Sequence, residues 1–292
     1  MKLGGIYPAL LTPFDTDGRL NEAAVPPLIE HLLEAGVDGF YVGGSTGEGL
    51  LMHLEERRRL TEAVVDAARG AARVIVHVGA PATADAVALA EHAARAGADA
   101  VSTLPPLFFR VGEDAVVEHY RRVAAAGLPL LAYHIPALTG QRVTPELMRR
   151  LAEVPGFAGL KFTDNDFYTM RHLIDDTAGR WTIFNGSDEI LLCGLVMGAD
   201  GGIGSTYNLM PQAFVSLFRA FRAGDLATAQ EMQFRITRAV RAIIALPGIG
   251  ALKAAMAARG LDLGTPRLPL PAVPLETGRQ LAATVERLLN ED

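Results

Sequence analysis

Lysine is almost absent from this chain of 292 residues. Of its 27 lysine and arginine residues, only Lys2, Lys161 and Lys253 are lysine. An arginine keeps its proton in a protein, whereas a lysine in a dry pocket can lose it and act as a nucleophile. The scarcity of lysine therefore excludes amine chemistry from nearly all of the chain and leaves few candidates for it.

Other scarcities narrow the class of protein. Cys193 is the only cysteine, which excludes an intrachain disulfide and favours a cytoplasmic location. The first 25 residues lack a basic segment followed by an apolar core, and no apolar run approaches the length of a membrane span. We therefore expect no targeting segment and no membrane partner.

Positive charge is also not concentrated anywhere. There is no long basic run and the formal net charge is −6, so we expect no nucleic-acid partner. The 7 histidines show no ligand-type spacing with one another, so no metal site is predicted. Half of the residues are hydrophobic and 21% are charged, which allows a large folded core.

Short apolar runs alternate with longer stretches whose apolar residues recur every three to four positions. Near-continuous apolar strands indicate burial on both faces, and hence a parallel sheet covered by helices. Eight such units predict an α/β fold of the closed (β/α)₈ TIM-barrel type. An open doubly wound sheet is the alternative, but no glycine-rich dinucleotide turn follows the first run. The runs cover residues 5–11, 39–43, 74–79, 100–104, 129–135, 159–163, 181–185 and 201–204.

The last strand leaves more chain than one closing helix needs. Residues 227–244, 250–259 and 277–289 have helical patterns, and we interpret the stretch around Lys253 as amphipathic. We predict a single domain, with the barrel in residues 1–224 and C-terminal helices in residues 225–292 packed on it.

Lys161 lies in the apolar run at residues 157–163. A lysine at a strand end can extend its amine to solvent along apolar surface, or it can sit in a pocket as a nucleophile. Position alone leaves both interpretations open. In a barrel of this type, chemistry takes place at the carboxyl ends of the strands, which is where this lysine falls.

Polar residues at other strand ends converge on the same rim. Ser45 and Thr46 lie in a glycine-flanked turn that suits a small anion, although their hydroxyls could instead cap a helix. Tyr133 could exchange a proton or be a half-buried aromatic. Asp188 and Glu189 could bind sugar hydroxyls or occupy the first turn of a helix.

These motifs, in this order, resemble the pyruvate-dependent class I aldolases of the dihydrodipicolinate synthase and N-acetylneuraminate lyase family. The resemblance runs from residues 5–14 into the C-terminal helices, and it implies a (β/α)₈ barrel with a three-helix extension, commonly in a homotetramer. Its most specific segments are residues 43–48, 133–136, 159–163 and 202–208.

The resemblance implies roles for four residues. Lys161 would form the imine with a keto acid such as pyruvate, Tyr133 would shuttle protons, and Ser45 and Thr46 would hold the carboxylate. An amine must be neutral to attack a keto carbon, and the resulting iminium is an electron sink beside which a C–C bond can break. The covalent imine makes a metal or an organic cofactor unnecessary.

Three segments favour the lyase branch, and the first is residues 161–168, which resemble the corresponding lyase stretch. Residues 136–140 are largely apolar where the synthase branch places an arginine for a second carboxylate, and residues 185–190 are similar to the lyase segment that binds the polyol tail. The resemblance thus implies cleavage of N-acetylneuraminate to N-acetylmannosamine and pyruvate. The implied sugar-binding residues are Thr163, Gly186, Asp188, Glu189 and Ser205.

One position departs from the family. The relay tyrosine that a neighbouring subunit usually contributes falls on Phe108, and Phe109 offers no hydroxyl either. Either water bridges Ser45 and Tyr133, which adds Ser45 to the catalytic residues, or the reaction differs from cleavage of N-acetylneuraminate. Other Schiff-base reactions therefore stay open, such as that of a 2-keto-3-deoxy sugar-acid aldolase or dehydratase. The synthase reaction, which forms 4-hydroxy-tetrahydrodipicolinate, and a non-catalytic barrel that binds a keto acid are further alternatives.

Overall fold

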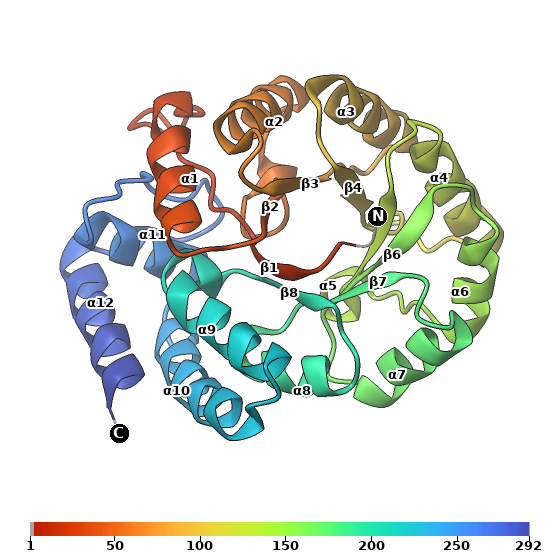
Figure 1. The fold of residues 1–292 in the computed structure, drawn as a ribbon. Helices are drawn as coiled ribbons and strands as arrows, with labels where there is room; N and C mark the ends of the chain where they lie inside the picture. The colour runs from red at the N-terminus through yellow and green to blue at the C-terminus, as the bar shows by residue number, and fades with distance from the viewer. Residues whose placement is uncertain (1–2, 292) are drawn as a thin grey trace.

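The structure is a computed structural model that describes residues 3–291, so Lys2 lies outside the described residues. Within this range, eight parallel strands form one sheet in the order β1-β8-β7-β6-β5-β4-β3-β2. Figure 1 shows the sheet from one end, surrounded by helices. The predicted strands are confirmed as β1 (Gly5–Pro8), β2 (Gly39–Val42), β3 (Arg73–His77), β4 (Ala100–Thr103), β5 (Leu130–His134), β6 (Phe157–Phe162), β7 (Thr182–Asn185) and β8 (Gly201–Gly204).

The sheet closes into a barrel between β1 and β2. The N–H of Leu10 donates to the carbonyl of Tyr41 at 2.8 Å, and the N–H of Asp38 donates to the carbonyl of Ile6 at 2.9 Å. The open doubly wound sheet is therefore excluded. The surrounding helices are α1 (Val25–Glu34), α2 (Leu54–Ala68), α3 (Thr83–Ala96), α4 (Glu113–Ala124), α5 (Pro136–Thr139), α6 (Pro145–Ala152), α7 (Phe167–Asp176), α8 (Leu191–Val196) and α9 (Pro211–Arg222).

The alternation of side chains along each strand divides the core into two parts. On β2, for example, Phe40 and Val42 face the helices, whereas Tyr41 points into the barrel. On β3, Val74 and Val76 pack outward and Ile75 packs inward. The interior is filled by side chains, so the site can only lie at a barrel end.

A β-bulge in β6 decides where Lys161 points. Leu130 of β5 pairs with Phe157, but the next residue, Leu131, pairs with Gly159, so Ala158 is an extra residue. Phe157 before the bulge and Leu160 after it both face the helices, although they are three positions apart. The bulge thus switches the parity of the strand and directs Lys161 into the barrel.

The C-terminal extension consists of α10 (Leu226–Ile244), α11 (Gly248–Ala258) and α12 (Leu275–Asn290), as predicted. Figure 1 shows these helices outside the ring, beside α1 and α9. The interpretation of the Lys253 stretch as amphipathic was wrong. Every residue from position 250 to 256 is buried, so α11 is covered on all sides, as expected for a helix that is apolar all round.

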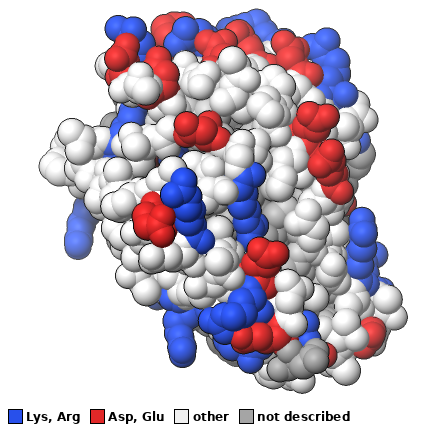
Figure 2. Space-filling view, turned by 90° about the vertical axis from the view of Figure 1, so that its left-hand side faces the viewer, with Lys and Arg blue, Asp and Glu red and all other residues white. Residues whose placement is uncertain are grey.

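Among residues 3–291, no single helix has both the length and the hydropathy to cross a membrane, and only α10 and α11 taken together, across a bend of 107°, pass that test. Figure 2 views the side of the molecule that is on the left in Figure 1. Basic and acidic side chains are intermingled on this face and do not gather into an area of one sign. This face therefore offers no basic track for a nucleic-acid backbone.

Candidate active site

Lys161 lies inside the carboxyl end of the barrel with only 4% of its surface exposed. Its Nζ is 4.1 Å from the centroid of the Tyr133 ring and 4.4 Å from that of Tyr41. The alternative in which this lysine extends to solvent is therefore wrong. The faces of aromatic rings attract cations, so the two tyrosines can stabilise the positive charge of an iminium formed at this nitrogen.

Tyr41 was not singled out in the sequence, yet its ring lies only slightly farther from Lys161 than that of Tyr133 does. Its hydroxyl donates to Ser102 Oγ at 3.1 Å, and burial raises its pKa well above the ordinary value. Tyr41 therefore stays a neutral ring. Side chains alternate between the two faces of a strand, so residue 41 of β2 points away from the face that carries residues 40 and 42. This alternation is the sequence signal that could have identified its inward position.

His77 is a second interior residue that the sequence analysis missed. Its ring centroid lies 5.9 Å from that of Tyr133, and its Nδ1 is 3.1 Å from the carbonyl oxygen of Gly43. Because a carbonyl only accepts, Nδ1 carries the proton, and the buried Nε2 has no partner among the described residues. Burial, followed by the charge of Arg57, lowers the pKa of His77 to about 3. The ring is thus neutral.

The turn that carries Ser45 and Thr46 follows β2 directly. Ser45 is exposed and Thr46 is half-buried. The N-cap of α2 is His53, whose N–H donates to Glu56 at 3.1 Å, so the two hydroxyls do not cap this helix. The turn needs glycine at its close approaches, because a Cβ on Gly49 would lie 1.8 Å from the Gly43 carbonyl oxygen.

Asp188 joins the ends of β7 and β8. One oxygen of its buried carboxylate accepts hydrogen bonds from the N–H of Thr206 at 2.8 Å, from the Thr206 hydroxyl at 2.7 Å and from the Ser205 hydroxyl at 3.4 Å. Burial raises the pKa of Asp188, while the bonds from Thr206 and the charge of Lys161 oppose the rise. The neighbouring Glu189 is exposed on the rim.

Thr163 and Gly186 meet between β6 and β7. The Thr163 Oγ1 is buried without a partner among the described residues, which leaves its hydroxyl available to a ligand. A Cβ on Gly186 would lie 2.0 Å from that oxygen, so glycine is the residue that fits beside it. The sequence analysis paired these residues only through the family resemblance.

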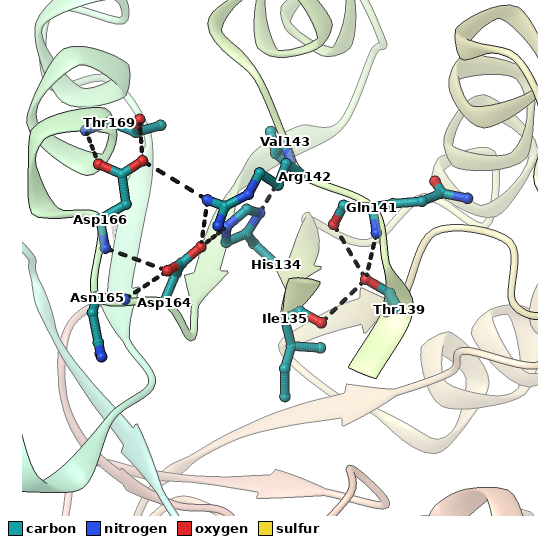
Figure 3. Close-up of polar contacts among 10 residues, drawn as sticks. All are labelled: His134, Ile135, Thr139, Gln141, Arg142, Val143, Asp164, Asn165, Asp166 and Thr169. Atoms are coloured by element: carbon teal, nitrogen blue, oxygen red, sulfur yellow. Dashed lines mark hydrogen bonds and ion pairs between the residues drawn. The ribbon is translucent and has the colours of Figure 1, made fainter. Parts of the chain in front are cut away.

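A pocket of about 470 Å³ lies at the mouth of the site, between the segments that follow β5 and β6. Figure 3 shows Arg142 extended across to Asp164, 2.8 Å away, with Asp166 at 3.8 Å. The N–H of Val143 donates to His134 Nδ1 at 3.0 Å, so the proton of this imidazole is on Nε2, which donates to Asp164 at 3.3 Å. The carboxylates of Asp164 and Asp166 together compensate the charge of Arg142. The sequence analysis missed this cluster.

The structure brings the predicted residues together in part. Contacts join Lys161 with Tyr133, Thr163 with Gly186, and Asp188 with Ser205. The turn with Ser45 and Thr46 reaches the lysine pocket through the Gly43–His77 contact. Phe108 and Phe109 lie on the loop between β4 and α4, with 94% and 69% of their surfaces exposed.

Comparison with known proteins places this geometry among enzymes. The family model described as "Dihydrodipicolinate synthetase family" matches residues 2–288. The N-acetylneuraminate lyase of Rhizobium meliloti (strain 1021) is 39% identical over 277 residues, which is 94% of this chain and 91% of that protein.

Solved structures agree with this assignment. The wild-type Ruminococcus gnavus sialic acid aldolase has a TM-score of 0.95 at 30% identity, with coverage of 99% of this chain and 98% of that one. The Proteus mirabilis N-acetylneuraminate lyase has a TM-score of 0.92 at 32% identity, with coverage of 99% of both chains. The barrel and its extension are thus shared along nearly the whole chain.

Proposed function

The chain belongs to the dihydrodipicolinate synthetase family, and we propose that it is a Schiff-base lyase that cleaves N-acetylneuraminate to N-acetylmannosamine and pyruvate. The observation that carries the proposal is Lys161, a buried amine held between two aromatic faces at the carboxyl end of the barrel. Relatives and structural neighbours named as lyases or sialic acid aldolases support it.

The reaction follows from this geometry. The neutral amine of Lys161 adds to the keto carbon of the substrate, and loss of water gives an iminium whose positive charge faces the rings of Tyr41 and Tyr133. Tyr133 takes the proton of the hydroxyl two carbons from the iminium carbon, and the C–C bond breaks to give an aldehyde and an enamine. Protonation of the enamine carbon and hydrolysis release pyruvate and restore the amine. No cofactor is required.

The carboxylate of the keto acid binds, in this proposal, at Ser45 and Thr46. Their N–H groups and hydroxyls lie in a turn closed by glycines, which suits a small anion. The Gly43 carbonyl at the start of the turn is tied to His77 inside the barrel. The carboxylate and the imine nitrogen are thereby held in one frame, which favours a productive orientation.

The rest of the substrate is a polyhydroxylated tail. Thr163, Gly186, Asp188, Glu189 and Ser205 lie on the rim where that tail would extend. The charge of Arg142 at the mouth is compensated by Asp164 and Asp166. A mouth of this kind suits a neutral tail better than a second carboxylate, which disfavours the synthase reaction.

A second candidate is a 2-keto-3-deoxy sugar-acid aldolase or dehydratase that uses the same imine. The specific observation in its favour is Phe108, which cannot pass a proton at the position where the family relay has a tyrosine. We further propose a homotetramer, because the resemblance places the loop with Phe108 at a subunit contact. The cytoplasmic location suggested by the single cysteine stays a prediction.

The test is reductive trapping. Incubation with pyruvate and borohydride should add a pyruvate-derived group to Lys161, as identified by peptide mass mapping, and Lys2→Arg should be labelled as the wild type is. Coupled assays of pyruvate release should show faster turnover with N-acetylneuraminate than with 2-keto-3-deoxygluconate. Label on another residue, or full turnover by Lys161→Arg, would refute the Schiff-base mechanism.

A further inference from the structure

The second described lysine, Lys253, is also buried. Its Nζ lies 2.8 Å from Glu48 Oε1, and the two side chains are 1% and 0% exposed. The same Nζ donates to the Thr265 carbonyl at 3.3 Å and lies 4.2 Å from the centroid of the Phe14 ring. This ion pair joins α11 of the extension to the turn that carries Ser45 and Thr46.

The other carboxylate oxygen of Glu48 is held by the same part of the chain. It accepts a hydrogen bond of 2.7 Å from the N–H of Arg267, in the segment between α11 and α12. The guanidinium of Arg267 donates to Glu56 at 2.8 Å and keeps the pKa of that carboxyl at about 2, well below its usual range. Both oxygens of Glu48 are therefore fixed by the C-terminal extension.

Glu48 occupies a backbone conformation that is unfavourable for a residue with a Cβ. Its φ is 56° and its ψ is 28°, in the left-handed region, which persists only where the surroundings enforce it. The N–H of Glu48 closes the turn by donating to the Ser45 carbonyl at 3.1 Å. The Thr12 hydroxyl holds the Gly47 carbonyl at 2.6 Å. The last residue of the turn is thus held through both its backbone and its side chain, beside the contact at Gly47.

A buried ion pair is a poor device for stability alone, because the cost of removing both charges from water offsets most of their attraction. Burial lowers the pKa of Lys253 and the charge of Glu48 opposes this, as expected for such a balance. The pair instead fixes the orientation of the Glu48 carboxylate relative to helix α11. This orientation matters for the Ser45–Thr46 turn, because backbone N–H groups bind an anion only when they point at it.

We propose that Glu48 and Lys253 are positioning residues that hold the Ser45–Thr46 turn in the orientation that binds the keto-acid carboxylate. The C-terminal helices are thereby a support of the active site. This inference rests on the proposed Schiff-base function. It predicts that loss of the pair weakens binding of pyruvate while Lys161 keeps its ability to form the imine.

The decisive variant is Glu48→Gln with Lys253→Met, because it removes both charges and keeps the shapes of the side chains. We expect a folded protein whose rate of borohydride trapping at saturating pyruvate stays within about two-fold of the wild type. The pyruvate concentration that gives half of this rate should rise about ten-fold. This combination indicates weaker binding of pyruvate with unchanged imine chemistry. Should the double variant fail to fold, Glu48→Gln alone should show the same rise, because Lys253 can then shed its proton.

The matched control is Glu276→Gln with Arg279→Met, which removes an exposed ion pair of 3.2 Å on α12 of the same extension. It should leave the half-saturating concentration unchanged. Folded variants of Glu48 and Lys253 with wild-type half-saturation would overturn the inference alone. Absence of trapping in the wild type would instead refute the proposed function, and this inference with it.

Discussion

At the scale of single residues, the barrel interior keeps His77 uncharged, and this has a consequence for stability. Its pKa in the folded protein is about 3, mainly through burial, whereas an exposed histidine titrates near 6.5. The unfolded chain therefore binds a proton at this residue between these two values and the folded protein does not. The contribution of His77 to the free energy of unfolding is fully present above about pH 6.5. It decreases by about 1.4 kcal/mol for each pH unit as the pH falls toward the folded-state pKa.

The variant His77→Gln isolates this contribution. It should lose stability at pH 7, because the hydrogen bond to the Gly43 carbonyl is weakened, and its stability should fall less steeply below pH 6.5 than that of the wild type. Urea unfolding at fixed protein concentration between pH 7 and pH 5 measures both slopes. Parallel slopes for the two proteins would contradict the assignment of a depressed pKa.

The same scale shows what the sequence could predict of the site. Lys161 was identifiable because a lysine in an apolar strand is unusual, and Tyr133 was identifiable through the family motif. Tyr41 and His77 were missed because each looks like an ordinary residue of a buried strand. Their roles depend on the parity of β2 and β3 and on contacts across the barrel, which arise only when distant strands meet.

At the scale of elements, the strands themselves were predictable and the bulge in β6 was not. Buried parallel strands are near-continuous apolar runs, and this pattern is local to the sequence. The bulge depends on Gly159, where a Cβ would lie 1.9 Å from the carbonyl oxygen of Thr182 on the neighbouring strand β7. No local pattern indicates that contact, although it determines that Lys161 points inward.

Gly159→Ala tests this role of the bulge. The added Cβ must push β6 away from β7 or remove the bulge, so we expect a loss of about 1–3 kcal/mol in stability and a large loss of imine trapping at Lys161. Urea unfolding and borohydride trapping at saturating pyruvate measure the two effects. Gly248→Ala is the control, because a Cβ there meets nothing within 4 Å. Wild-type trapping in a folded Gly159→Ala protein would show that the bulge does not aim the lysine.

At the scale of the whole molecule, the extension was predicted as packed helices, but its connection to the site was not. We interpreted the stretch around Lys253 as an amphipathic helix because a lysine is usually exposed. The structure buries that lysine because Glu48, about 200 positions earlier in the chain, is brought to it by closure of the barrel. Such a pair is a product of tertiary packing and leaves no local signal.

The rim of the barrel also carries apolar side chains that one chain leaves exposed. Phe108 and Phe109 stack edge to face at 5.1 Å and are 94% and 69% exposed, and Leu50 and Leu138 lie in other loops of the same rim. Grouped apolar surface of this kind favours association. We expect the double variant Phe108→Ser with Phe109→Ser to have a lower mass than the wild type in sedimentation velocity. The control is Leu268→Ser, which removes a leucine that is 88% exposed on the segment between α11 and α12 and should leave the mass unchanged. Lys161 belongs to each chain's own barrel, so the smaller species should still form the imine with pyruvate. An unchanged mass for the Phe108 and Phe109 variant would contradict a subunit contact at these residues.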